Sequence, residues 1–294
     1  MKEKTIYALG FFDGVHLGHQ ALLTECVRLA RQYDAIPCAI TFRQHPQSLF
    51  CENPPKLIND LRSRRYLMGQ YGIEEVQAYP VTKEVMSMAW QDFLTELAEK
   101  GAAGFICGKD FRFGNRGEGN AEKLKAYCRE RNLLCSIVVD QTLEGIRVSS
   151  THIRNLLEAG DLEEAIRFMG HPYVISGEVI SGRKLGRTIG VPTANLLLPE
   201  EVVELPRGVY ACIAVAEGQE YLAVTNIGSR PTVGGHQTRA EAWLLDFDGD
   251  LYGKQLTLEF YKFLRPERKF DSLEELTKEI QKNAAETRKI FEKT

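Results

Sequence analysis

The chain has 294 residues, enough for about two domains at roughly 100–200 residues each, and its 44% hydrophobic and 26% charged residues are the balance of a globular protein that buries real cores. The formal net charge of −3 argues against nucleic acid as a partner. The lack of a secretory leader and of an uninterrupted apolar run of roughly 18 residues argues against a membrane. Seven scattered cysteines without a CxxC pair predict reduced thiols in the cytoplasm and disfavour a zinc site.

The first half of the chain alternates short apolar runs with amphipathic helical patterns. The runs are apolar on both faces, which is typical of parallel strands that are covered on both sides. The helical patterns end at residues that stop helices, such as Gly101. This alternation predicts a doubly wound α/β domain. The predicted strands span residues 5–10, 37–42, 76–80, 104–108 and 134–139, and the predicted helices span 21–32, 90–100 and 120–131.

Two short predicted helices, 151–159 and 162–169, lead to a change of character at His171-Pro172. Gly160 and Gly170 stop these helices, and Asp161 is the expected cap between them. Beyond this point turn signals separate strand-like runs with no long helix between them, which predicts a small, mostly antiparallel barrel. The runs span 173–179, 193–198, 209–215, 221–226, 239–247 and 255–263, and an amphipathic helix is expected over 272–291.

The first predicted strand runs into the segment GFFDGVHLGH, residues 10–19, where His16 and His19 lie at the start of a helix. Ligands of open α/β sheets bind at the carboxyl ends of strands, and a helix N-terminus favours phosphate. A plain glycine turn with surface histidines is the alternative, but the position of the pattern favours a site. It resembles the HxGH signature of nucleotidylyl transferases and class I aminoacyl-tRNA synthetases. The other candidate binding residues of the segment are Gly10, Phe11, Asp13, Gly14 and Gly18.

Two further segments of the first half carry polar groups suited to nucleotide binding. The segment GKDFRFGNRGEG, residues 108–119, contains Asp110 among glycines, arginines and aromatics that suit a flavin or adenine beside phosphates; its composition also describes a flexible loop. In the segment VSSTHIR, residues 148–154, the hydroxyls at a helix start are N-cap residues or phosphate ligands. The candidate residues there are Ser149, Ser150, Thr151 and Arg154.

The most informative segment of the second half spans residues 177–195. Its glycines recur every four residues between cations, which suits polyphosphate, although a basic hairpin has the same composition. It ends in Pro-Thr-Ala-Asn, which resembles the PTAN signature of riboflavin kinases. Farther on, alternation places Glu241 and Trp243 on one face of a strand. Glu241 alone reads as a surface charge, but a base is needed where an alcohol attacks phosphorus.

The whole set of motifs resembles the bacterial bifunctional riboflavin kinase/FAD synthetase family over nearly all of residues 5–291. The motifs are GFFDGVHLGHQ, TF..HP (Thr41, Phe42, His45 and Pro46), DFRFG, SSTHIR and PTAN, in the order and spacing of that family. The resemblance implies that His16 and His19 stabilise the departing pyrophosphate and that Glu241 is the catalytic base of the kinase. It implies nucleotide or flavin binding by Asp110, Ser149, Ser150, Thr151, Arg154, Gly182, Lys184 and Gly186, and Mg²⁺ coordination by Thr193 and Asn195.

The resemblance also implies the architecture and the reactions. We expect an α/β nucleotidylyl-transferase domain of Rossmann-like fold over residues 1–170, and an antiparallel β-barrel riboflavin kinase domain with a C-terminal helix over 173–294. The substrates would be riboflavin, FMN and ATP, with Mg²⁺ as the metal. Two alternatives stay open: an enzyme in which only the kinase is competent, and a flavin-binding regulator that has lost catalysis. The second is disfavoured because a pure binder has no use for a base.

Overall fold

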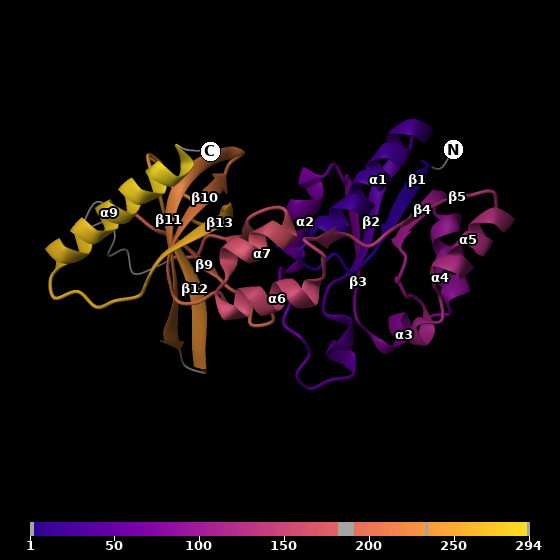
Figure 1. The fold of residues 1–294 in the computed structure, drawn as a ribbon, viewed down its shortest axis with the longest axis horizontal. Coiled ribbons are helices and arrows are strands. Elements are labelled where there is room, and N and C mark those ends of the chain that lie inside the picture. Colours follow the sequence, from indigo (N-terminus) through magenta and orange to yellow (C-terminus); the bar gives the residue numbers. More distant parts are fainter. Residues whose placement is uncertain (1–2, 182–190, 233–234, 293–294) are drawn as a thin grey trace. The chain divides into compact units, whose positions relative to one another are not determined.

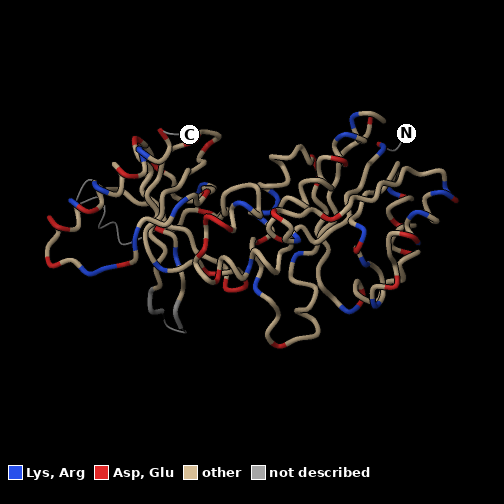
Figure 2. Tube along the Cα trace, in the orientation of Figure 1, with Lys and Arg blue, Asp and Glu red and all other residues tan. Residues whose placement is uncertain are grey.

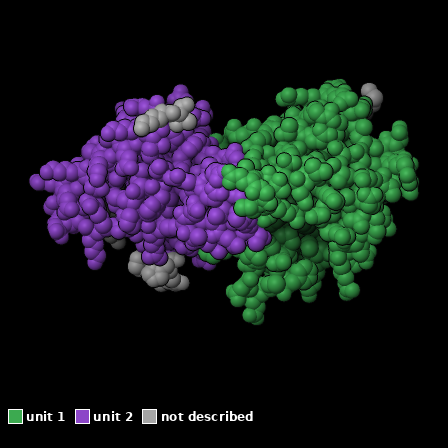
Figure 3. All heavy atoms as spheres, viewed as in Figure 1, with its two compact units in different colours: residues 1–57, 64–150 green, residues 58–63, 151–294 purple. Residues whose placement is uncertain are grey.

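The computed structural model describes residues 3–181, 191–232 and 235–292 (Figure 1). The chain divides into two compact units, coloured separately in Figure 3. The first unit comprises Met1–Leu57 and Arg64–Ser150, and the second comprises Ile58–Ser63 and Thr151–Thr294.

The first unit is built on a parallel sheet of five strands with the order β3-β2-β1-β4-β5. All five predicted strands are confirmed. The three inner strands are almost entirely buried, as their two-faced apolar runs predict, but the edge strands β3 and β5 are only half-buried. The prediction of full coverage was therefore wrong at the edges, where a strand has a neighbour on one side only. The bounds are β1 Thr5–Leu9, β2 Ile36–Phe42, β3 Glu75–Tyr79, β4 Ala102–Gly108 and β5 Leu134–Val138.

Helices cover both faces of this sheet. Tyr7 and Leu9 of β1 point to the face where they pack with Leu94 of α4 and Leu124 of α5, while alternate residues such as Ile6 face α1. The predicted N-cap of α5 is confirmed by a hydrogen bond of 2.9 Å from the backbone N–H of Lys123 to Asn120 Oδ1. The helices are α1 Leu17–Tyr33, α2 Leu61–Gln70, α3 Lys83–Met86, α4 Trp90–Glu99 and α5 Ala121–Glu130, with 3₁₀ turns η1 Pro46–Leu49 and η2 Asn115–Gly117 and a hairpin of β6 Thr142–Leu143 and β7 Ile146–Arg147.

The second unit contains two short helices and a six-stranded antiparallel sheet with the order β8-β13-β10-β11-β12-β9. The sheet curls into a nearly closed barrel, because the backbone N–H of Ile180, just beyond β8, donates to the carbonyl of Asn195 in β9 at 2.9 Å. The predicted barrel is confirmed. The bounds are α6 Ser150–Ala159, α7 Leu162–Met169, β8 Tyr173–Glu178, β9 Ala194–Leu197, β10 Gly208–Ala216, β11 Gln219–Thr232, β12 Gly235–Leu244 and β13 Gln255–Pro266.

The closing helix α9, Leu273–Phe291, packs on one face of the barrel sheet. Its Ala284 joins a buried apolar cluster with Val209, Val224 and Leu245, and Trp243 packs against that cluster. The helix begins at an N-cap, Ser272, whose side chain accepts a hydrogen bond of 3.1 Å from the backbone of Glu275. The sheet face that carries Trp243 is therefore the face that α9 covers.

Charged residues are interspersed along the chain. Lysines and arginines alternate with aspartates and glutamates throughout both units (Figure 2), in keeping with the net charge of −3. Among the described residues, no helix combines the length and apolar character needed to cross a bilayer.

Candidate active sites

The first unit contains a pocket of about 230 Å³ at the carboxyl ends of β1, β4 and β5. The strand order reverses between β1 and β4, because β2 and β3 lie on one side of β1 while β4 and β5 lie on the other. Open α/β sheets bind their ligands at such a reversal. The predicted site residues that line this pocket are Gly10, Phe11, His16, Gly18, His19, Asp110, Ser149 and Ser150.

His16 and His19 form a stacked pair at the start of α1. Their ring centroids are 3.7 Å apart and their planes differ by 12°. His16 caps the helix, and its Nδ1 accepts a hydrogen bond of 3.3 Å from the backbone N–H of His19. The helix begins at Leu17, earlier than the expected residue 21, so His16 is the N-cap and His19 lies in the first turn. Free backbone N–H groups and the positive end of the helix dipole make this turn a favourable place for phosphate.

The surroundings of His19 favour the neutral form of its imidazole. Burial lowers the pKa of His19 well below its usual range, and positive potential from His16 and Arg64 lowers it further. Its Nδ1 atom is buried and has no hydrogen-bond partner among the residues that the structure describes. Buried polar atoms without partners are rare and costly. An oxygen of a ligand in the pocket would satisfy this nitrogen.

The loop between β1 and α1 has a strained backbone. The φ angle is 55° at Phe12 and 37° at Val15, on either side of Gly14 at 79°. A positive φ is uncommon for residues other than glycine and is an outlier for a β-branched residue such as valine. Each such residue costs about 1–3 kcal/mol, and such strain persists only where the surrounding structure holds it in place. The loop that presents the histidines is therefore held by contacts outside itself.

Two predicted glycines, Gly10 in this loop and Gly18 in the first turn of α1, are needed for close packing. A Cβ atom at Gly10 would lie 2.9 Å from the ring of Phe12, which is fully buried. A Cβ atom at Gly18 would lie 3.2 Å from Cε1 of His16. A side chain at position 18 would therefore displace the imidazole of His16.

Asp110 belongs to an ion-pair cluster that the sequence did not indicate. Arg147 Nη2 lies 2.8 Å from Asp110 Oδ2 and 3.2 Å from Asp140 Oδ2, and all three residues line the pocket. The side chains of Asp110 and Arg147 are each 58% exposed, so their pairing adds at most about 1 kcal/mol to stability. Arg147 comes from the two-residue strand β7, which is too short to show a periodic pattern.

The serine motif lies at the start of α6. Ser150 Oγ donates a hydrogen bond of 2.9 Å to the carbonyl of Asp13 and so ties this segment to the histidine loop. Asp13 and Gly14 are buried and are not part of the pocket lining defined by the described residues. Thr151 and Arg154 belong to the second unit, and their contacts with phosphate stay predictions.

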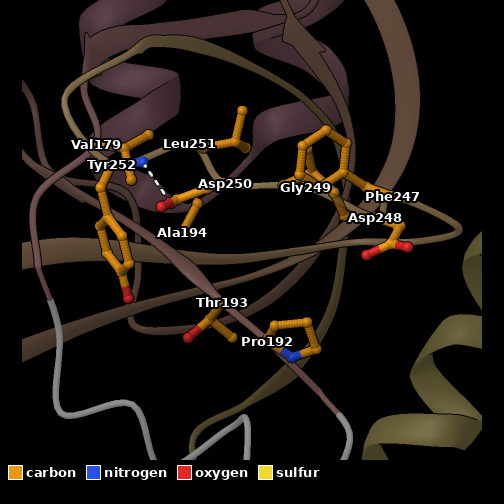
Figure 4. A pocket seen from close by; sticks show the side chains of 11 residues that line it. Val179, Pro192, Thr193, Ala194, Phe247, Asp248, Gly249, Asp250, Leu251 and Tyr252 are labelled. Atoms are coloured by element: carbon orange, nitrogen blue, oxygen red, sulfur yellow. Dashed lines mark hydrogen bonds between the residues drawn. The ribbon is translucent and has the colours of Figure 1, made fainter.

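The second unit contains a pocket of about 380 Å³ (Figure 4). On one side, Pro192, Thr193 and Ala194 lead into β9; the loop of residues 247–252 that follows β12 lies across from them. Within this loop, Asp250 Oδ1 accepts a hydrogen bond of 3.0 Å from the backbone of Tyr252. Thr193, one of the predicted kinase residues, therefore lines a cavity with polar and aromatic walls.

Asn195, Glu241 and Asn226 form a row across three neighbouring strands. The register pairs Glu241 of β12 with Asn195 of β9 and with Asn226 of β11, so their side chains share one face, with Cβ atoms about 5 Å apart. Trp243 shares this face by alternation, as predicted, so the row lies on the face that α9 covers. Asn226 Nδ2 also donates a hydrogen bond of 3.1 Å to Glu267 Oε1. Glu241 is thus flanked by two amides.

Asn195 has the properties of a residue that coordinates a metal ion. The residue is 3% exposed, and its buried Oδ1 has no hydrogen-bond partner in the part of the chain that the structure describes. Its Nδ2 donates to the carbonyl of Thr193 at 3.5 Å. A neutral oxygen held in this way, two residues after the hydroxyl-bearing Thr193, suits Mg²⁺, which prefers oxygen ligands. The remaining predicted kinase residues, Gly182, Lys184 and Gly186, lie outside the described residues.

Family models match both halves of the chain. The model of FAD synthetase matches residues 1–152, and the model of riboflavin kinase matches residues 169–291.

Curated relatives match the chain over nearly its whole length. A bifunctional riboflavin kinase/FMN adenylyltransferase of Listeria monocytogenes is 34% identical over 98% of this chain and 93% of its own length. The enzyme of the same name from Escherichia coli K12 is 35% identical over 99% of this chain and 94% of its own. A solved structure from Streptococcus pneumoniae, described as a macrolide-efflux protein, has a TM-score of 0.79 and 29% identity over 98% of this chain and 95% of that chain.

Proposed function

The chain belongs to the family of bifunctional riboflavin kinases/FMN adenylyltransferases, and from this premise we propose that each activity has its own site, one in each unit. The protein phosphorylates riboflavin with ATP to give FMN, and adenylylates FMN with a second ATP to give FAD and pyrophosphate. The observation that supports the site assignment is that each candidate site has a buried polar atom without a partner in the described chain, His19 Nδ1 in one and Asn195 Oδ1 in the other.

In the kinase reaction, Glu241 acts as the general base. It takes the proton of the terminal ribityl hydroxyl of riboflavin, whose oxygen then bonds to the γ-phosphorus of ATP. The bond from that phosphorus to the bridging oxygen breaks, and ADP leaves. The amides of Asn195 and Asn226 on either side of Glu241 give this proton transfer a polar, half-buried setting. Thr193 and Asn195 would hold Mg²⁺, which supplies neutralisation of phosphate charge.

In the adenylyl transfer, an oxygen of the FMN phosphate attacks the α-phosphorus of ATP. The bond from that phosphorus to the α,β-bridging oxygen breaks, and pyrophosphate leaves with the electron pair. His16 and His19, together with the N–H groups of the first turn of α1, stabilise the negative charge that builds on the leaving group. We propose phosphate or flavin contacts for Asp110, Ser149 and Ser150, and add Arg147 as a further cation of this pocket. The proposed phosphate contacts of Thr151 and Arg154 rest on their sequence motif.

Three further assignments are proposals. The glycine-rich segment with Gly182, Lys184 and Gly186 binds the phosphates of ATP in the kinase site, on the argument of its sequence. The functional domains span residues 1–170 and 173–294. The segment between the two family matches, residues 153–168, is matched by neither model, and its helices α6 and α7 belong to the same compact unit as the barrel. We place the protein in the cytoplasm, which its seven free cysteines support.

Two substitutions test whether the sites are separate. His19→Ala is expected to lower FAD formation from FMN by about 10²–10³-fold, the usual cost of one lost electrostatic contact to a transition state, and to leave FMN formation unchanged. Glu241→Ala is expected to lower FMN formation by about 10²–10⁴-fold and to leave FAD formation from supplied FMN unchanged. Chromatography of the flavin products measures both rates.

A matched control for the glutamate is Glu220→Ala, which removes an exposed carboxylate from the neighbouring strand β11 and should change neither rate. If either site variant loses both activities while its circular dichroism spectrum stays that of the native protein, the two-site assignment fails.

A further inference from the structure

Arg64 of α2 is the largest side chain that is fully buried among the described residues, with 0% of its surface exposed. Its neighbours Arg62 and Arg65 on the same helix are exposed. Burying a guanidinium is costly unless its donors are satisfied by hydrogen bonds. Neither of the two proposed reactions uses Arg64.

The guanidinium of Arg64 holds two separate segments together. Its Nη1 donates to the carbonyl of Phe11 at 2.9 Å and to Thr41 Oγ1 at 2.9 Å. Its Nη2 donates to the carbonyls of Phe42 at 2.9 Å and Arg43 at 3.2 Å. Thr41 Oγ1 in turn donates to the carbonyl of Phe11 at 2.6 Å, and the guanidinium lies over the Phe11 ring at 5.1 Å. The planar fork of arginine thus joins the end of β2 to the loop that follows β1.

The segment that Arg64 holds is the strained loop of the first pocket. Phe11 lines the pocket and directly precedes Phe12, the first residue with a positive φ. On the far side of Phe12, the carbonyl of Asp13 is held by Ser150 Oγ at 2.9 Å. Arg64 and Thr41 therefore fix the first end of the strained turn, and the serine fixes the middle. Without the first anchor, the loop can relax toward ordinary backbone angles and carry the histidines with it.

Arg64 also brings charge to the pocket without lining it. Its positive potential is one of the causes that lower the pKa of His19, so its field reaches that imidazole. This field opposes a proton on His19. Toward a bound polyphosphate, the same field is attractive.

We infer that Arg64 is a positioning residue for adenylyl transfer: it ties the Phe11 carbonyl to the end of β2, which keeps the strained loop in the conformation that presents His16 and His19. The inference rests on the proposed role of these two histidines. The TF pair at residues 41–42 then has a structural meaning, since its threonine hydroxyl and its phenylalanine carbonyl are two of the four acceptors of Arg64.

Three variants of the full-length protein test the inference. Arg64→Met removes the donors and the charge; Arg64→Lys keeps the charge and some of the donors; Arg65→Met removes an exposed arginine from the next position of α2 and is the control. We expect the kcat of FAD formation from FMN to fall about 100-fold in Arg64→Met, because a misplacement of about 1 Å has that effect. The KM for FMN should stay within about threefold, because binding contacts are kept. Arg64→Lys should have a kcat between those of Arg64→Met and the wild-type protein, and Arg65→Met should have the kcat of the wild-type protein.

The kinase reaction of the same molecules, measured in parallel, should be unchanged. Normal kcat in folded Arg64→Met, or an equal loss in Arg65→Met, overturns the inference. If Arg64→Met does not fold, Thr41→Val carries the test: it removes the shared hydroxyl at similar volume, and we expect kcat to fall about 10-fold, whereas an unchanged kcat again overturns the inference. His19→Ala is run beside these variants. If His19→Ala keeps full FAD formation, the histidine assignment itself has failed; if only the arginine and threonine variants keep it, the positioning role alone has failed.

Discussion

Gly18→Ala should separate stability from catalysis in the first unit. Gly18 lies in the first turn of α1, where alanine favours the helix over glycine by up to about 1 kcal/mol. The added Cβ would lie 3.2 Å from Cε1 and 3.3 Å from Nδ1 of His16, closer than ordinary van der Waals contact. The imidazole must therefore shift by about 0.3 Å. If a misplacement of about 1 Å costs about 100-fold in rate, a shift of about 0.3 Å costs about fourfold.

The expected result is an unchanged or raised melting temperature together with FAD formation lowered about fourfold and FMN formation unchanged. Thermal denaturation and flavin chromatography on one preparation measure all three quantities. Gly69→Ala is the matched control: it lies in α2, an added Cβ meets nothing within 4 Å, and it should raise stability without changing either rate. Full FAD formation in Gly18→Ala would refute the reasoning that the position of His16 limits adenylyl transfer.

Two further predictions concern the ligands. ATP binding to the first pocket should take up protons near pH 7, because phosphate charge raises the lowered pKa of His19, so affinity should increase as pH falls. Calorimetry in buffers of different ionisation enthalpy measures this uptake, and equal uptake in His19→Asn would contradict the assignment. In the second unit, Asn195→Ala should raise the Mg²⁺ concentration for half-maximal FMN formation by about tenfold or more. An unchanged Mg²⁺ dependence would remove Asn195 from the metal site.

The sheet of the first unit could be predicted from the sequence because its strands are apolar runs between helical patterns. What the runs could not show is which strands lie at the edges. The run that became β3 includes Val76 and Ala78, and the run that became β5 includes Ile137, yet every residue of both strands is at least partly exposed. Whether a strand lies at an edge depends on the spatial order of the strands in the sheet. The residues of a single strand carry no signal of that order.

The helix α2 was missed, and with it the buried arginine. Its sequence, LRSRRYLMGQ, has three arginines and reads as a polar surface segment. Only Arg64 of the three is buried. No local pattern marks it, because the carbonyls that accept its hydrogen bonds lie 21 to 53 residues away in the sequence. The sequence did not indicate Arg147 for the same reason, since its partner Asp110 is 37 residues away.

The resemblance to the family indicates which residues belong to the kinase site, but only the structure shows how they are arranged. Alternation predicted that Glu241 and Trp243 share a face, and the register confirms it, because Glu241 pairs with Asn226 and Trp243 with Val224 on β11. The pairing of Glu241 with Asn195 depends on the register of β12 with β9. These strands are far apart in the sequence, and a register between distant strands has no local signal.

Mixing two single-site variants tests most directly whether one chain carries two independent sites. With riboflavin, ATP and Mg²⁺, His19→Ala alone should accumulate FMN and Glu241→Ala alone should leave riboflavin unchanged. Because FMN released by the first protein can enter the intact pocket of the second, the mixture is predicted to produce FAD. If the mixture stops at FMN or at riboflavin while the unchanged protein makes FAD under the same conditions, the account of two separate active sites is wrong.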